Sequence, residues 1–339
     1  MKAKYLKIAA VLATSLALFG SNSATAQNSD WKHSLVFGAG SLGGVYYTVA
    51  GAISDLLPQK VKGIDRVSSI TGSTSSFIPM IQAGKIDMML GTPDAMYFGW
   101  SAEEGQGFKK DERFDKLRLA GVAYVNIMDL VVLADSGIDS VKGIGDGRVA
   151  VLSATLKVPM ERYLEAHGVK NPNVTIIGNW NQMAQALRDG NIKAMQAISM
   201  HPAPAMTELG IAVRLKLLTY SSEEAVKKFL ANPSTRFFQK VVQPAGTYDW
   251  QKEDYATVGR GTTLGVSADL PDDQVYAIVK AIYENVGALA KVHPAAAQFS
   301  IEKMQEYLDA GVIQIPFHPG ARRYFEERGV KIPASVPTK

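Results

Sequence analysis

Apolar and polar positions in the first third of the chain predict strands and helices in turn. Short apolar runs bounded by turn residues are typical of buried strands, and apolar residues three or four apart are typical of helices. We expect strands at residues 34–37, 66–71 and 86–90 and helices at residues 45–57 and 77–82. Pro58 is expected to end the first helix and Gly84 the second, and Pro93 to begin a third. This alternation predicts a parallel, doubly wound α/β sheet.

The rest of the chain repeats this alternation after one long extended segment. Residues 117–134 are expected to be extended, with an interruption near Asn126, and are a candidate connection between two lobes. Further strands are expected at residues 149–152, 174–177, 194–198, 214–218 and 257–266, and helices at residues 159–166, 180–188, 272–292 and 301–310. The length of 339 residues also favours two domains.

One corner between a helix and a strand occurs in both parts of the chain. Gly84 and Ile86 stand between an expected helix and strand, and Gly190 and Ile192 stand in the same way about 106 residues later. That distance is too long for a solenoid repeat. The echo therefore favours two lobes of similar topology, and chance similarity at a common kind of corner is the alternative.

The first 26 residues predict an export signal. Lys2, Lys4 and Lys7 precede an apolar run of about twelve residues, and Ala24 and Ala26 are the small residues that a signal peptidase reads. A membrane-spanning helix needs about 20 apolar residues, so a membrane anchor is the weaker interpretation. We expect cleavage after Ala26 and a periplasmic mature protein.

Composition argues against several classes of protein. The chain has 36 Lys and Arg residues, and without the three lysines of the expected signal 33 remain against 32 Asp and Glu. This balance, without a basic stripe interleaved with aromatics, argues against nucleic-acid binding. The chain has no cysteine, its five histidines have no metal-ligand spacing, and it has no G-x-S-x-G motif. We therefore expect no metal, no cofactor, no catalytic residues and no enzymatic activity.

The most informative loop is Gly38–Tyr47, which follows a predicted strand and opens a predicted helix. It matches G-x-G-x-x-G, but dinucleotide binding also needs an acidic residue at the end of the second strand, where Ile70 and Thr71 stand instead. What remains is a helix N-terminus at which glycines let backbone N–H groups approach a ligand. The loop favours a carboxylate, phosphate or sulfonate group, and a tight turn without a ligand is the alternative.

Hydroxyl side chains recur at helix N-termini after the later strands. These loops hold Ser73 after the second strand, Thr92 after the third, and Ser153 with Thr155 after the first strand of the second part. Such loops face one crevice in open α/β sheets, and ligands bind there. The pattern predicts a cleft rich in neutral hydrogen-bond donors, although a single Ser or Thr at such a position is usually only a helix cap.

These loops and several later segments resemble the TAXI family, the extracytoplasmic solute receptors of TRAP transporters. The similar segments are residues 38–47, 71–73, 84–87, 94–97, 201–205, 244–248 and 315–324. The resemblance covers nearly all of the expected mature chain, and its first and last segments are the specific ones.

The resemblance implies a type II periplasmic-binding-protein fold, in which two α/β lobes joined by a hinge enclose a ligand cleft. We expect lobe I to comprise residues 31–124 plus 247–339 and lobe II residues 125–246. The resemblance also implies a TRAP-type membrane permease as the partner, often driven by sodium. The implied ligand is a small organic anion: an amino acid, a dicarboxylate or a keto acid. We expect the receptor to be a monomer.

Twelve residues are the predicted ligand contacts. The family's pocket loops correspond here to Gly40, Ser41, Gly43, Gly44, Tyr46, Gly72 and Ser73; the residues themselves add Thr92, Ser153, Thr155, Lys157 and Trp180. Lys157 is a candidate partner for a second anionic group, and a solvated lysine is the alternative. Thr92 and the loop from Ser153 to Lys157 depart from the family pattern. Glutamate, which several members of the family bind, is therefore not directly implied as the ligand of this chain.

Two other functions stay open. A sensory receptor that presents its closed form to a membrane kinase would use the same binding physics, so the sequence does not separate it from a transport receptor. An exported α/β hydrolase would need a nucleophile with a neighbouring base, and the sequence offers no such pair.

Overall fold

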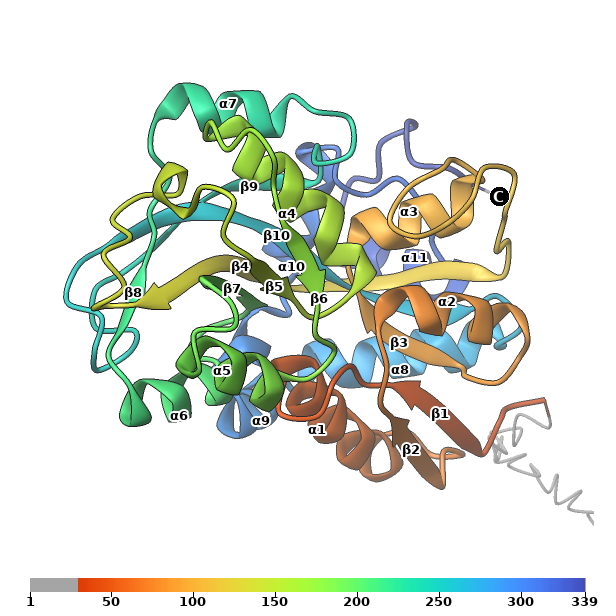
Figure 1. Ribbon diagram of the computed structural model, residues 1–339. Coiled ribbons are helices and arrows are strands. Elements are labelled where there is room, and N and C mark those ends of the chain that lie inside the picture. The colour runs from red at the N-terminus through yellow and green to blue at the C-terminus, as the bar shows by residue number, and fades with distance from the viewer. Residues whose placement is uncertain (1–29, 339) are drawn as a thin grey trace, which may run out of the picture.

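The computed structural model describes residues 30–338, and one mixed ten-stranded sheet runs through this part of the chain (Figure 1). The strand order is β2-β1-β3-β10-β4-β7-β5-β6, with β8 beside β4 and β9 beside β10. The strands are β1 (Ser34–Gly38), β2 (Arg66–Ile70), β3 (Met88–Gly91), β4 (Leu117–Leu133), β5 (Val149–Val151), β6 (Val174–Ile176), β7 (Ala194–Ser199), β8 (Leu215–Leu217), β9 (Phe238–Gln243) and β10 (Tyr255–Ser267).

Helices cover both faces of this sheet (Figure 1). They are α1 (Val45–Lys60), α2 (Thr74–Gln82), α3 (Pro93–Ser101), α4 (Ala154–Ala166), α5 (Trp180–Arg188), α6 (Pro204–Ala212), α7 (Glu223–Leu230), α8 (Asp272–Glu284), α9 (Val286–Val292), α10 (Ile301–Asp309) and α11 (Pro319–Glu327), with 3-10 turns η1 (Lys142–Ile144) and η2 (Pro294–Gln298). No helix in the described part of the chain is long and apolar enough to cross a membrane. The predicted export signal lies outside the described residues.

The two long strands β4 and β10 run antiparallel to each other through both halves of the molecule (Figure 1). On one side β10 pairs with β3, and on the other β4 pairs with β7. The predicted break near Asn126 is wrong, because Asn126 stays in the ladder opposite Arg260. The ladder instead has two register shifts, one beside this pair between Gly261 and Thr263 and one between Leu264 and Gly265. The predicted parallel sheet holds for each half, and these two strands make the whole sheet mixed.

The apolar side chains form separate cores in the two halves. One core draws on residues 35–124, 237 and 264–336, and we call the part built on it lobe I. Two further cores lie within residues 128–258, and we call that part lobe II. In Figure 1, α4 and α7 lie above the sheet of lobe II, and α5 and α6 lie below it. The boundaries after residues 124 and 246 stay a prediction.

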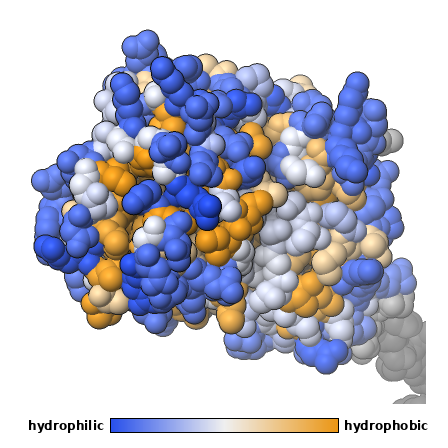
Figure 2. Space-filling model, in the orientation of Figure 1, coloured by the Kyte–Doolittle hydropathy of each residue, from blue (hydrophilic) through white to orange (hydrophobic). Residues whose placement is uncertain are grey.

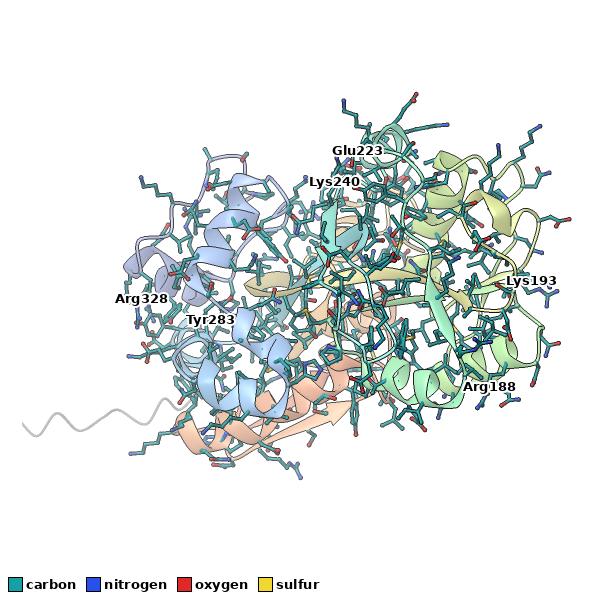
Figure 3. The ribbon with its side chains drawn as sticks, turned by 90° about the vertical axis from the view of Figure 1, so that its left-hand side faces the viewer. Arg188, Lys193, Glu223, Lys240, Tyr283 and Arg328 are labelled. Carbon is teal, nitrogen blue, oxygen red and sulfur yellow. The ribbon has the colours of Figure 1, made fainter. Side chains whose placement is uncertain are left out.

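The repeated corner has the same backbone hydrogen bonds in both lobes. Lys85 N and Ile86 N donate to Met80 O, at 2.8 and 3.4 Å, and Asn191 N and Ile192 N donate to Ala186 O, at 2.9 and 3.3 Å. The glycine between helix and strand has a φ of 67° at Gly84 and 73° at Gly190, the left-handed conformation that glycine adopts without strain. Figure 3 shows Arg188 and Lys193, which flank the second corner, toward the outer edge of lobe II. The echo in the sequence is thus a shared local structure.

Some predicted element boundaries are wrong, for local reasons. Helix α1 continues past Pro58 to Lys60, because Val61 N still donates to Leu57 O at 2.9 Å and closes the last turn. The predicted helix 272–292 divides at Asn285, whose side-chain amide donates to Ala281 O at 2.8 Å and ends α8. Helices α6, α7 and α11 and strand β9 were not predicted from the sequence.

Candidate functional site

A cavity of about 100 Å³ lies at the boundary of the two lobes. Loops at the N-termini of α1, α2 and α3 reach it from lobe I, and those of α4 and α5 reach it from lobe II. In the orientation of Figure 1, Figure 2 shows apolar residues near the middle of this face with hydrophilic residues around them. The lining residues are Gly40, Ser41, Gly44, Val45, Tyr46, Gly72, Ser73, Thr74, Thr92, Asn126, Leu152, Ser153, Thr155, Leu156, Trp180, Ile198 and Arg260.

The first loop is fixed against the second-strand loop by backbone hydrogen bonds. Gly72 N donates to Gly40 O at 3.2 Å, and Gly44 N donates to Ser41 O at 3.0 Å. Gly40 has a φ of 83°, and a Cβ added there would lie 2.6 Å from Tyr46 Cβ. Only glycine fits this position, since both the conformation and the space exclude a side chain. The loop therefore brings its backbone close to the cavity in one defined shape.

The hydroxyl groups of the cavity divide into those that cap a helix and those that do not. Ser73 caps α2: its Oγ accepts from Ser76 N at 3.3 Å, in a capping box. Thr92 and Ser153 are the N-cap residues of α3 and α4, but neither side chain makes the capping hydrogen bond. Thr92 Oγ1 is buried without a partner. Ser153 Oγ instead lies 2.7 Å from Thr155 Oγ1. The missing caps leave helix N–H groups available to a ligand, and Thr92 adds a hydroxyl without a partner.

Trp180 brings lobe II close to the first loop of lobe I. It is the first residue of α5, and its indole is buried. A Cβ added to Gly44 would lie 3.8 Å from Trp180 Nε1. Asn179, the preceding residue, caps α5 by accepting from Asn181 N at 2.9 Å and Gln182 N at 3.1 Å. The cap holds the start of α5, and with it the indole, at the edge of the cavity.

The two long strands contribute polar side chains to the cavity. Arg260 of β10 lies opposite Asn126 of β4 on one side and opposite Phe238 of β9 on the other. Asn126 Nδ2 donates to Tyr46 Oη at 2.9 Å and to Thr262 Oγ1 at 2.5 Å. Burial is the main reason why the pKa of Tyr46 is raised, to about 12, so its phenol stays protonated at neutral pH. Neither Asn126 nor Arg260 was predicted from the sequence as a cavity residue.

Arg260 is the one ionic side chain among the residues that line this cavity. Its guanidinium is 1% exposed, stacks on the Phe238 ring at 5.2 Å, and forms an ion pair with Asp94 of α3 through Nη1 and Oδ2. Asp94 is fully buried and does not line the cavity. Arg260 Nε has no hydrogen-bond partner. The sequence did contain a signal for Arg260, since it is a single arginine between two glycines in an otherwise uncharged strand. A buried arginine at such a position needs a counter-ion.

Ten of the twelve predicted contacts line the cavity. The exceptions are Gly43 and Lys157. Lys157 Nζ lies 3.4 Å from Glu161 Oε1, one turn further along α4, and its side chain is 43% exposed. This geometry is that of an exposed ion pair on a helix surface, and it gives Lys157 no contact with the cavity.

Two buried histidines, His201 and His318, lie outside the cavity. His201 Nε2 lies 2.7 Å from Asp129 Oδ2, and both side chains are buried within lobe II. Burial raises the pKa of Asp129. His318 is the N-cap residue of α11: its Nδ1 accepts from Gly320 N at 3.3 Å, and its Nε2 lies 3.0 Å from Leu270 O. His318 thus has a structural role at the start of α11.

The chain belongs to the NMT1-like family, whose model matches residues 37–329. Several solved structures are similar to it in fold. A protein from Bordetella bronchiseptica RB50 is similar at a TM-score of 0.50 and 14% identity, over 88% of this chain and 98% of that one. A protein from Xanthomonas citri bound to ATP is similar at a TM-score of 0.50 and 12% identity, over 87% of this chain and 95% of that one.

A third similar structure is that of the periplasmic aliphatic sulphonate binding protein SsuA from Escherichia coli. Its TM-score is 0.45 and its identity 14%, over 91% of this chain and 96% of that one. The predicted α/β class is confirmed by the sheet and by the helices on both of its faces.

Proposed function

We propose that this chain is an extracytoplasmic solute-binding receptor that captures a small organic anion between its two lobes. The observation that carries the proposal is the cavity itself: its donors come from helix N-termini of both lobes, and its one ionic lining residue is the cation Arg260. Uncapped helix N-termini and a guanidinium both favour negative charge. A ligand that contacts both lobes stabilises the closed arrangement, because it binds that arrangement more tightly than an open one.

The partner in this proposal is a TRAP-type membrane permease, and the mature receptor is a periplasmic monomer. The support for the permease type is the resemblance of the glycine loop and the C-terminal segment to the TAXI receptors. Uptake of the ligand by cells that express the receptor with its permease tests this choice. Uptake that follows an imposed sodium gradient supports a TRAP permease, whereas uptake that requires ATP and ignores the gradient contradicts it.

Native mass spectrometry of the purified protein, followed by a thermal-shift screen, tests the binding function. We expect an adduct of small mass in a one-to-one ratio, lost after partial unfolding and refolding. The stripped protein should then be stabilised by some carboxylates or sulfonates, by about 2.7 kcal/mol when the ligand concentration is 100 times its Kd. No adduct and no shift with any organic anion would contradict the proposal.

A further inference from the structure

The ionic groups at the cavity restrict the chemistry of the ligand further. We propose that Arg260 anchors the anionic group of the ligand, and that the ligand carries no amino group. This inference rests on the proposed function, because it concerns the same cavity. It separates keto acids, hydroxy acids, plain carboxylates and sulfonates from amino acids.

Arg260 is held in place while part of its donor set stays free. A guanidinium has five N–H donors in a rigid planar arrangement. Asp94 takes Nη1, the Phe238 ring covers one face at 5.2 Å, and Nε has no partner. The ion pair and the stacked ring fix the plane of the guanidinium before a ligand arrives. An arginine with a fixed plane and a free donor edge loses little side-chain entropy when it binds a carboxylate or sulfonate.

The cavity offers no negatively charged partner for an ammonium group of a ligand. None of the lining residues is an aspartate or a glutamate, and Asp94, which pairs with Arg260, is fully buried and does not line the cavity. The pKa of Tyr46 is raised to about 12, so its phenol gives no negative charge either. The positive ends of α1, α3 and α4 and the charge of Arg260 all repel a cation. A zwitterionic amino acid would desolvate its ammonium group without gaining an ionic partner.

Matched pairs of probes test the ligand class by calorimetry on the ligand-stripped, full mature chain. The pairs are 2-oxoglutarate with L-glutamate and pyruvate with L-alanine, and ethanesulfonate serves as an anion without an amine. We expect one of the amine-free anions to bind at least about tenfold more tightly than any amino acid. The reason is that burying the ammonium group of an amino acid without an ionic partner weakens binding by at least this factor. An amino acid that binds as tightly as its keto acid overturns this inference but leaves the receptor in place. Binding of no probe contradicts the proposed function as well.

Two variants test the role of Arg260 with whichever anion binds. Asp94→Asn removes the counter-ion and leaves the arginine, so the affinity for the anion should rise. Asp94→Asn with Arg260→Gln removes both charges and avoids an unpaired buried carboxylate, and the affinity should fall about ten- to hundredfold. If Arg260 only holds α3 in place, Asp94→Asn should instead weaken binding. That result, or an unchanged affinity in the double variant, would overturn the proposal.

The matched control is the exposed ion pair between Glu223 of α7 and Lys240 of β9, which Figure 3 labels. It is of the same kind, a carboxylate with a cation, but neither residue lines the cavity. Glu223→Gln with Lys240→Gln should leave the affinity for the anion unchanged. Equal losses in this control and in the cavity double variant would also overturn the proposal, because they would show that the effect does not depend on the cavity.

Discussion

Arg260 of β10 lies directly opposite Asn126 of β4, and both side chains line the cavity. Glycines flank Arg260, and a Cβ on Gly259 would lie 2.7 Å from Asn126 O, so the two strands approach closely at this point. Both strands continue into both lobes. The anchor that we propose for the ligand is therefore on the elements that the lobes share, and the donors that surround it come from each lobe separately.

Removing one partner of the buried ion pair should destabilise the fold more than removing both. Arg260→Gln alone leaves the Asp94 carboxylate buried without a counter-ion, so the free energy of unfolding should fall by about 3–5 kcal/mol. Adding Asp94→Asn should restore most of that loss, because no charge then remains buried. Urea unfolding of the wild type and the two variants measures this difference. A double variant that is as unstable as Arg260→Gln alone would contradict it.

Alanine should destabilise the protein to different extents at two glycines of the first loop, Gly40 and Gly43, although their backbone conformations are similar. Gly40 has a φ of 83° and Gly43 a φ of 80°, so an alanine at either position costs about 1–2 kcal/mol of backbone strain. Gly40→Ala also places its Cβ 2.6 Å from Tyr46 Cβ, whereas Gly43→Ala meets no atom within 4 Å. We expect the first variant to lose more stability and, through displacement of Tyr46, ligand affinity as well. Chemical denaturation and calorimetry compare the two, and equal effects would show that the contact with Tyr46 is unimportant.

Lys157 gives a prediction about the other candidate cation of the site. Because its ammonium group pairs with Glu161 on the surface of α4 and does not line the cavity, Lys157→Gln should change the affinity for an anion by no more than about twofold. Calorimetry at two ionic strengths checks this. A loss of about tenfold at both ionic strengths would mean that Lys157 reaches the ligand in the closed form.

His318 predicts an acid-sensitive contribution to stability. Burial lowers the pKa of His318 below its ordinary value, although the nearby Asp272 carboxylate acts in the opposite direction. A histidine whose pKa is lowered by folding binds its proton more readily in the unfolded chain. Its contribution is therefore complete above about pH 6.5 and is lost as the pH falls toward the lower folded-state value.

The variant His318→Asn should make the unfolding free energy less steep between pH 7.5 and pH 5. Asparagine keeps an N-cap for α11, so the slope against pH is the informative quantity and the absolute stability is not. The pKa values of His167 and His293 are also lowered by burial, so part of the slope should remain. Slopes that are identical in the variant and the wild type would contradict the assignment.

The elements that the sequence predicted well have strong local signals. Helix α5 begins at Trp180 after an asparagine cap and ends at Arg188, as its apolar spacing indicated. The hydroxyl loops were found because Ser and Thr at strand ends are a local pattern. Helix α11 was missed because Pro319 and Gly320 stand at its start, and a Pro-Gly pair usually marks a turn. The glycine is there because a distant element packs against it. A Cβ on Gly320 would lie 1.9 Å from Asp272 O.

The polar side chains of β4 and β10 could not be placed from the sequence. Asn126 suggested a break in the strand, because a polar residue in an apolar run is usually a sign of exposure. Its position in the sheet depends on partners 80 and 136 residues away, Tyr46 and Thr262. Arg260 likewise depends on Asp94, which is 166 residues away. These pairings arise from the strand order, and no local pattern contains them.

A crystal structure of the protein grown with saturating 2-oxoglutarate, or with the anion found by native mass spectrometry, tests the central claim most directly. We predict electron density for the anion in the cavity between the lobes, with an oxygen about 3 Å from Arg260 Nε and others near the N-termini of α1 and α4. An anion bound elsewhere on the molecule, or one in the cavity with its anionic group turned away from Arg260, would contradict this account.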